Sequence, residues 1–151
     1  NIIPDYDLDL MSNNQTLELL TEKIINGVSK ILKDIKPDLV FVQGDTTTTF
    51  ATSLVTFYNK IPVAHIEAGL RTNDMYSPFP EEINRKLSSC IATYHFPPTE
   101  VSRQNLISEG IALIILSLFR QTIFISGLMA SCKSFPSETV KRVTSIPLRA
   151  K

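Results

Sequence analysis

The sequence predicts a doubly wound α/β fold with a parallel sheet, and two observations support this prediction. Predicted helices and strands alternate along the chain with short connections, which is the order expected of βαβ units. In addition, residues 39–42 are four consecutive apolar residues between polar ones, which is typical of a strand buried on both faces of a parallel sheet. We therefore expect a parallel sheet covered by helices.

The first predicted helix runs from about Asn14 to Lys36. Its apolar residues recur mainly at spacings of three and four and form one face, made of Leu17, Leu20, Ile24, Ile25, Val28, Ile31 and Leu32. Ser12 and Gln15 match a capping box at the start of this helix. Pro37 is expected to end it.

The elements after this helix are shorter and follow one another closely. Strands are expected at residues 38–45, 61–66 and 93–96, and helices at residues 46–59, 81–89 and about 99–109. Thr99 is the expected cap of the last helix. Turn-forming residues occupy the segment from 68 to 80.

Composition excludes several classes of protein. The 151 residues include 15 basic and 15 acidic side chains, so the zero net charge argues against a strongly basic nucleic-acid binder. A hydrophobic fraction of 43% excludes disorder of the whole chain. Cys90 and Cys132 are far apart, which excludes a disulfide scaffold and a zinc-finger site and favours a reduced, cytoplasmic setting. The start resembles no signal peptide, and without an initiator Met, residue 1 is not expected to be the natural start.

The character of the chain changes after Gly110. Residues 111–119 form an apolar run that is shorter than the roughly 20 residues needed to span a bilayer, and extending it to Ala130 would bury Arg120 and Gln121. We therefore expect no membrane association. The remainder is basic and has no clean period. The sequence thus predicts a partial domain at 1–110 and a divergent tail without regular structure at 111–151.

The first candidate functional segment, Gln43–Thr49, falls where a predicted strand ends and a helix begins. Ligands of open α/β sheets bind beyond the carboxyl ends of the strands, where a helix N-terminus favours anions. Asp45 is the candidate functional residue. Alternatively, Asp45 only caps the helix and the threonines bond local backbone. The pattern is not a P-loop, because Gly-x-x-x-x-Gly-Lys is absent.

The second segment places His65 and Glu67 two residues apart at the end of a predicted strand, so we expect them to share one face. An acid-base role is more plausible than a metal site, since no third ligand is evident. The alternative is a buried His65 that is hydrogen-bonded to backbone.

The third segment, Tyr76–Arg85, contains prolines that stiffen the approach to a helix opened by acids. Glu81 either complements the helix dipole or is aimed into the same cleft as Asp45 and Glu67. Arg85 either clamps a phosphate or pairs with the acids.

Taken together, these segments resemble the bacterial non-hydrolysing UDP-N-acetylglucosamine 2-epimerases over roughly residues 3–109. The matching motifs are Lys36-Pro37-Asp38, Gln43-Gly44-Asp45 with its four threonines, Phe57-Tyr58, Ile61-Pro62-Val63, His65 to Thr72, Tyr76 to Glu82, Asn84-Arg85, Tyr94-His95-Phe96, Pro98-Thr99-Glu100 and Ser102 to Leu106. Several motifs agree in both order and spacing, so the resemblance is specific.

The resemblance implies part of the N-terminal domain of a GT-B fold, in which two Rossmann-like domains face each other across a cleft. It implies interconversion of UDP-GlcNAc and UDP-ManNAc by elimination of UDP to 2-acetamidoglucal and re-addition. Asp45, Glu67 and Glu81 correspond to the three acidic active-site residues, and His65, Arg71 and Arg85 are expected to bind substrate. Neither a metal nor a redox cofactor is required. The intact form is expected to be a cytoplasmic homodimer that feeds polysaccharide or cell-wall synthesis.

The chain departs from the family at both ends. The family's first strand, its Gly-Thr-Arg-Pro-Glu loop and its C-terminal domain are absent, and Thr122–Gly127 is the best candidate for the expected next strand. Frameshifts near Ile111 and Leu128 would explain the tail, so we expect a fragment that is inactive alone. Two alternatives are a GT-B glycosyltransferase fragment and a non-catalytic interaction protein.

Overall fold

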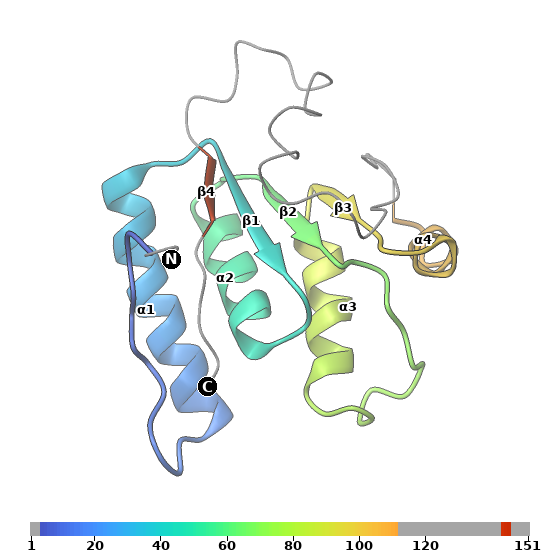
Figure 1. Ribbon diagram of the computed structural model, residues 1–151, viewed down its shortest axis with the longest axis horizontal. Helices are drawn as coiled ribbons and strands as arrows, with labels where there is room; N and C mark the ends of the chain where they lie inside the picture. Colours follow the sequence, from blue (N-terminus) through green and yellow to red (C-terminus); the bar gives the residue numbers. More distant parts are fainter. Residues whose placement is uncertain (1–3, 112–142, 146–151) are drawn as a thin grey trace.

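The computed structural model describes residues 4–111 and 143–145. Within them, a parallel sheet has the strand order β3-β2-β1-β4, and helices α1, α2 and α3 lie side by side along it (Figure 1). The helices are α1 (Leu17–Ile35), α2 (Thr47–Tyr58), α3 (Glu81–Ile91) and α4 (Glu100–Ser108). The strands are β1 (Leu39–Gln43), β2 (Val63–Ile66), β3 (Tyr94–Phe96) and β4 (Val143–Ser145). The predicted α/β fold with a parallel sheet is therefore confirmed.

The first helix begins later than predicted. Asn14 has a φ of 57°, a left-handed backbone that a helix cannot contain, and Thr16 caps α1 by accepting a hydrogen bond from the Leu19 N–H at 3.3 Å. Only half of the predicted capping box forms, because the Gln15 side chain accepts from the Ser12 N–H at 3.1 Å, ahead of the helix. At the other end, Lys36 adopts a left-handed conformation before Pro37, so the predicted stop is confirmed.

The main core lies between the sheet and its helices. It joins Ile24, Val28 and Leu32 of α1, Val40 and Val42 of β1, Ala51 and Val55 of α2, and Val63 of β2. The α1 residues recur every four positions, which is the period of one helix face. This core fixes α2 against β1 and β2, so the loops beyond the carboxyl ends of both strands begin from a rigid base.

The opposite face of the sheet is apolar as well. Leu39, Ala64 and Phe96 are buried there, and the rings of Phe41 and Phe96 lie 6.1 Å apart between centroids. Residues on both faces of β1 are thus apolar, which explains why this strand reads as a continuous hydrophobic run in the sequence.

The tail contains one element that its aperiodic sequence did not predict. Residues 143–145 form β4, which pairs in parallel with residues 39–41 of β1. The apolar run beyond Ile111 and the candidate strand at 122–127 lie outside the described residues, and the division at residue 110 stays a prediction. Across the part of the chain that the structure describes, no helix has the length and hydrophobicity to cross a bilayer.

Candidate functional site

The loop between β1 and α2 presents Asp45 beyond the carboxyl end of the sheet. Gly44, with a φ of 77°, turns the chain out of the strand, and Thr46 caps α2 by accepting from the Thr49 N–H at 3.3 Å. The Thr49 hydroxyl donates to the Gln43 carbonyl at 2.6 Å. The alternative in which Asp45 caps the helix is therefore wrong, although these threonines do bond local backbone. Asp45 keeps its carboxylate for other contacts.

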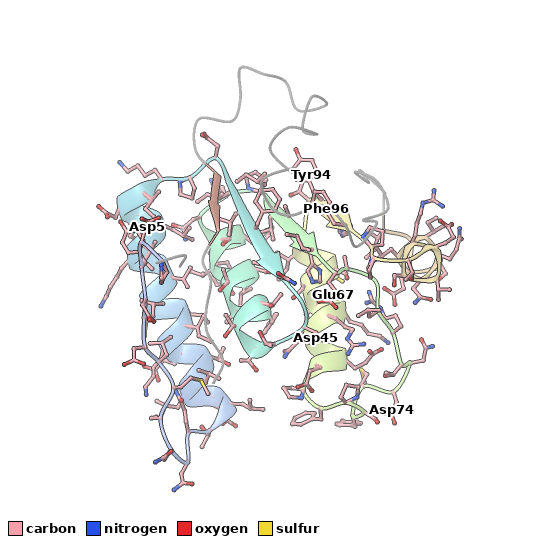
Figure 2. All side chains as sticks on the ribbon, viewed as in Figure 1. Asp5, Asp45, Glu67, Asp74, Tyr94 and Phe96 are labelled. Carbon is pink, nitrogen blue, oxygen red and sulfur yellow. The ribbon has the colours of Figure 1, made fainter. Side chains whose placement is uncertain are left out.

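Glu67 lies at the corresponding end of the neighbouring strand, as Figure 2 shows for the labelled Asp45 and Glu67. Its backbone has a φ of 68°, its N–H donates to the Phe96 carbonyl at 3.0 Å, and its side chain is exposed. A Cβ placed on Gly44 would lie 3.7 Å from Glu67 Oε2, so this carboxylate lies against the loop that carries Asp45. The two acids therefore lie over the same edge.

His65 lies in the core beneath these acids. It is fully buried, and its Nε2 lies 2.7 Å from the Gly44 carbonyl oxygen, so Nε2 carries the proton and donates it. His65 is therefore the buried, backbone-bonded histidine of the two alternatives given for it above. Burial holds the pKa of His65 below its usual value, although the bond to Gly44 opposes this. The prediction that His65 and Glu67 share one face is wrong, because β2 ends at Ile66 and the left-handed backbone at Glu67 breaks the alternation.

A second buried histidine, His95, pairs in register with His65 on β3. Its Nε2 lies 3.1 Å from the Ser89 carbonyl oxygen. Burial, followed by the nearby His65 and Arg71, lowers the pKa of His95 to about 4. Both rings therefore stay neutral near pH 7 and act as hydrogen-bonded parts of the core.

Arg85 connects α3 to Asp45. Its Nη2 donates to Asp45 Oδ2 at 2.9 Å, and its Nη1 lies 3.3 Å from Glu82 Oε2. Of the two alternatives for Arg85, this structure contains the pairing with acids. Glu81 precedes Arg85 by one helical turn on the same face of α3 and is half-buried.

Arg71 makes a different set of contacts. Its Nε and Nη2 each lie 2.7 Å from a Glu109 carboxylate oxygen, its Nη1 donates to the Leu70 carbonyl at 2.7 Å, and its Nη2 lies 3.1 Å from Ser89 Oγ. The side chain is 1% exposed. Hydrogen bonding to Arg71 holds the pKa of Glu109 below its usual value. Arg71 thus ties the loop after β2 to the end of α4, and within residues 4–111 its hydrogen bonds go to Glu109, Leu70 and Ser89 and not to Asp45, Glu67 or Glu81.

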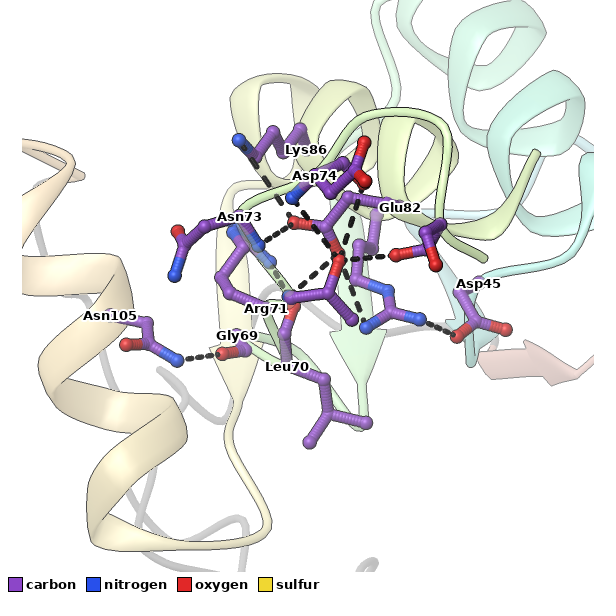
Figure 3. A network of polar contacts seen from close by, with 12 residues as sticks. Asp45, Gly69, Leu70, Arg71, Asn73, Asp74, Glu82, Lys86 and Asn105 are labelled. Carbon is purple, nitrogen blue, oxygen red and sulfur yellow. Dashed lines mark hydrogen bonds and ion pairs between the residues drawn. The ribbon is translucent and has the colours of Figure 1, made fainter. Parts of the chain in front are cut away.

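Sequence reasoning missed Glu82, which it treated only as a helix-opening acid. Its side chain is fully buried and accepts from the backbone N–H groups of Thr72 and Asn73, both at 3.1 Å (Figure 3). A signal for this role was present, since adjacent helical residues point about 100° apart and Glu81 and Glu82 therefore project in different directions from α3.

The site thus combines carboxylates, an arginine and a helix N-terminus at the carboxyl edge of a parallel sheet. Among residues 4–111 and 143–145, no group of three or more His, Cys, Asp or Glu side chains is arranged to hold a metal ion. Fold and site together define an α/β protein with carboxylates at the sheet edge where open α/β sheets commonly bind ligands.

Comparison with known proteins gives the family. The family model described as UDP-N-acetylglucosamine 2-epimerase matches residues 1–130, and the chain belongs to that family. The chain is 60% identical over 111 residues to the UDP-N-acetylglucosamine 2-epimerase of Salmonella typhimurium, covering 74% of the chain and 30% of the relative. It is 49% identical over 141 residues to that of Escherichia coli O157:H7, covering 93% and 38%.

Solved structures agree with this assignment. The Neisseria meningitidis UDP-GlcNAc 2-epimerase bound to UDP-GlcNAc matches 74% of the chain at 58% identity with a TM-score of 0.71, and 30% of that structure is covered. The Methanocaldococcus jannaschii enzyme in complex with UDP-GlcNAc and UDP matches 76% of the chain at 45% identity with a TM-score of 0.71, and 31% is covered. The predicted family and its GT-B type of fold are confirmed. The match reaches residue 130, beyond the expected limit near residue 109.

Proposed function

We propose that this chain supplies the proton-transferring carboxylates of a UDP-N-acetylglucosamine 2-epimerase. The reaction interconverts UDP-GlcNAc and UDP-ManNAc. A base removes the proton from sugar C2, the C1–O bond to UDP breaks, and a C1–C2 double bond forms in 2-acetamidoglucal. UDP then adds back to C1 while a proton is delivered to C2 from the opposite face, so atoms and charge balance without a redox step.

One observation carries the proposal: Asp45 and Glu67 extend from neighbouring strand ends over one edge, with Glu67 Oε2 lying against Gly44. Glu81 opens α3 one turn before the arginine that contacts Asp45. We assign Asp45, Glu67 and Glu81 jointly to proton transfer at C2 and to support of the leaving group. Their positions beyond the strand ends leave them accessible to a sugar nucleotide.

The three expected substrate-binding residues divide into two groups. Arg85 donates a hydrogen bond to Asp45 and therefore lies at the edge of the sheet where we expect the substrate. The contacts of His65 and Arg71 instead support the loops that carry Asp45 and Glu67. We therefore propose that only Arg85 of these three lies next to the sugar nucleotide.

The isolated chain is expected to have negligible activity. It spans 30% of the length of the Salmonella typhimurium relative, and catalysis of an elimination needs a site closed to water. The intact protein is expected to be a cytoplasmic homodimer without a metal or redox cofactor. Size-exclusion chromatography coupled to light scattering would test the dimer.

A chimaera tests the proposed function. Residues 4–111 replace the matching segment of the Neisseria meningitidis relative, to which they are 58% identical, and the product of UDP-GlcNAc turnover is followed by NMR. The expected result is UDP-ManNAc, with none formed by the isolated chain. A folded chimaera that leaves UDP-GlcNAc unchanged, while the parent enzyme converts it, would contradict the proposal and favour a non-catalytic role.

A further inference from the structure

Glu82 is a buried carboxylate without a role in the proton transfer proposed above. Its side chain is fully buried, and its two oxygens accept from the Thr72 and Asn73 N–H groups at 3.1 Å each. Burying an ionised carboxylate is unfavourable by several kcal/mol unless hydrogen bonds and a counter-charge compensate. Glu82 has these hydrogen bonds and also counter-charges, since Arg85 Nη1 lies 3.3 Å from its Oε2 and Lys86 Nζ lies 3.9 Å from its Oε1.

Arg85 connects this buried carboxylate to Asp45. One guanidinium nitrogen, Nη1, is next to Glu82 and the other, Nη2, donates to Asp45 Oδ2 at 2.9 Å, so one rigid planar group contacts both acids. The Arg85 side chain is 10% exposed, whereas that of Asp45 is 30% exposed. Asp45 is therefore held through one oxygen and keeps an accessible face for a ligand.

From this geometry we propose that Glu82, acting through Arg85, is a positioning residue that fixes the carboxylate of Asp45. The inference rests on the proposed catalytic function of Asp45. Glu82 orients the Arg85 guanidinium, and the guanidinium in turn orients Asp45 Oδ2. The same carboxylate holds the turn at Thr72 and Asn73, so the loop after β1 and the loop after β2 are joined through one buried ion pair (Figure 3).

A purely local role for Glu82 does not account for these contacts. An acid that only complements a helix dipole interacts with the first turn of its own helix and works at the surface. Glu82 instead bonds backbone groups of a different segment. Glu100 and Arg103 of α4 have the same i,i+3 spacing and a 2.9 Å contact, but their side chains are 56% and 37% exposed. Among the described residues, the hydrogen bonds of Glu100 stay within α4. That pair is the matched control.

The first test uses the complete chain and does not depend on activity. The ¹³C resonance of the Asp45 side-chain carboxyl and the hydrogen exchange of the Thr72 and Asn73 amides are compared in Glu82→Gln, Arg85→Lys and the control Glu100→Gln. We expect both Glu82→Gln and Arg85→Lys to move the Asp45 resonance. Glu82→Gln should also speed exchange of the two amides by about tenfold or more. An Asp45 resonance that is unchanged in Glu82→Gln would overturn the inference, even if Arg85→Lys moves it.

The second test measures turnover in the chimaera described above. Glu82→Gln and Arg85→Lys are expected to lower kcat by about 10- to 100-fold, because displacement of a catalytic group by a fraction of an ångström has effects of this size. KM should stay within about threefold in Glu82→Gln, because Glu82 does not contact the substrate. Guanidinium added to Arg85→Ala should restore part of kcat, and Glu100→Gln should leave kcat unchanged.

The two tests separate the two claims. An inactive chimaera with wild-type acids contradicts the proposed function, while the Asp45 resonance still decides the inference. An active chimaera in which Glu82→Gln lowers thermal stability but leaves kcat unchanged makes Glu82 only a structural residue, and the inference is then wrong.

Discussion

Arg71 and Arg85 are both buried arginines bonded to carboxylates, yet they serve different regions of the molecule. Arg71 holds Glu109, the Leu70 carbonyl and Ser89, so its contacts join a loop to the end of α4. Arg85 contacts Glu82 on one side and Asp45 on the other, at the edge of the sheet. From the sequence alone both were expected to bind substrate.

The two arginines differ in how many carboxylate oxygens they bind on Glu109 and on Asp45. Glu109 has both oxygens bonded to Arg71, whereas Asp45 is held through Oδ2 only and its side chain stays 30% exposed. An acid held by both oxygens serves structure, and an acid held by one can still exchange a proton. The following predictions use this contrast between an Arg71 region that stabilises the fold and an Arg85 region that is proposed to take part in catalysis.

The largest effect is expected at an acid outside both ion pairs. In the chimaera, Glu67→Gln should lower kcat/KM by about a thousandfold, because it removes a proton-transferring group. The exposed side chain contributes little to folding, so Tm should change by less than about 2 °C. Steady-state kinetics measures kcat/KM, and calorimetry measures Tm. A large fall in Tm with normal turnover would contradict the assignment of Glu67.

Gly69→Ala tests the packing of the Arg71 region. Gly69 has a φ of 87°, and an added Cβ would overlap the backbone carbonyl of Ser102 on α4. The left-handed backbone and the overlap together should lower the free energy of unfolding by about 3 kcal/mol. Urea unfolding measures this, with Gly110→Ala as the control, because Gly110 is also left-handed but an added Cβ there meets no atom of the described residues within 4 Å. Equal stability of the two variants would contradict this packing.

The buried histidines predict loss of stability in mild acid. The folded state keeps His65 and His95 neutral, with the pKa of His95 at about 4, so the unfolded chain binds protons first as the pH falls below 6.5. Stability is therefore complete above pH 6.5 and decreases toward pH 4. For His95 alone, the loss between pH 7.5 and pH 5 is about 2 kcal/mol.

Urea unfolding at pH 7.5, 6 and 5 measures this loss. An ordinary histidine titrates within this range, so a change in stability here follows the histidines of the unfolded chain. His95→Gln should flatten the dependence relative to the wild-type chain. A wild-type unfolding midpoint that is constant over this range would show that the rings are not held neutral.

The smallest of these effects is expected from Arg71→Met. It should lower the free energy of unfolding by about 1–2 kcal/mol, since Glu109, 33% exposed, can be hydrated when its partner is lost. In the chimaera, kcat should fall less than in Arg85→Lys. If Arg71→Met instead abolishes turnover without loss of stability, the contrast between the two arginines fails.

The sequence pattern was sufficient to predict the fold and to predict that Asp45 and Glu67 follow the carboxyl ends of strands. The apolar run of β1, the period of α1 and the Thr99 cap are local signals, and each was confirmed. The helix caps at Thr16 and Thr46 were missed because several neighbouring Ser, Thr, Asn or Asp side chains compete for a cap, and only the backbone geometry selects one.

The contacts of the site depend on pairs far apart in the sequence. The burial of Glu82 follows from the path of the loop at Thr72 and Asn73, and the Arg85 contact with Asp45 spans 40 positions. No local period encodes such contacts. Strand β4 was missed for the same reason, because the short segment at residues 143–145 pairs with β1 about a hundred residues earlier.

The most direct test of the central claim is solvent deuterium at sugar C2. The chimaera is incubated with UDP-GlcNAc in D₂O, and C2 of the products is examined by NMR and mass spectrometry. Proton removal at C2 followed by delivery from the other face predicts UDP-ManNAc with one deuterium at C2, and its loss in Glu67→Gln. UDP-ManNAc that keeps the original hydrogen at C2 would contradict the account.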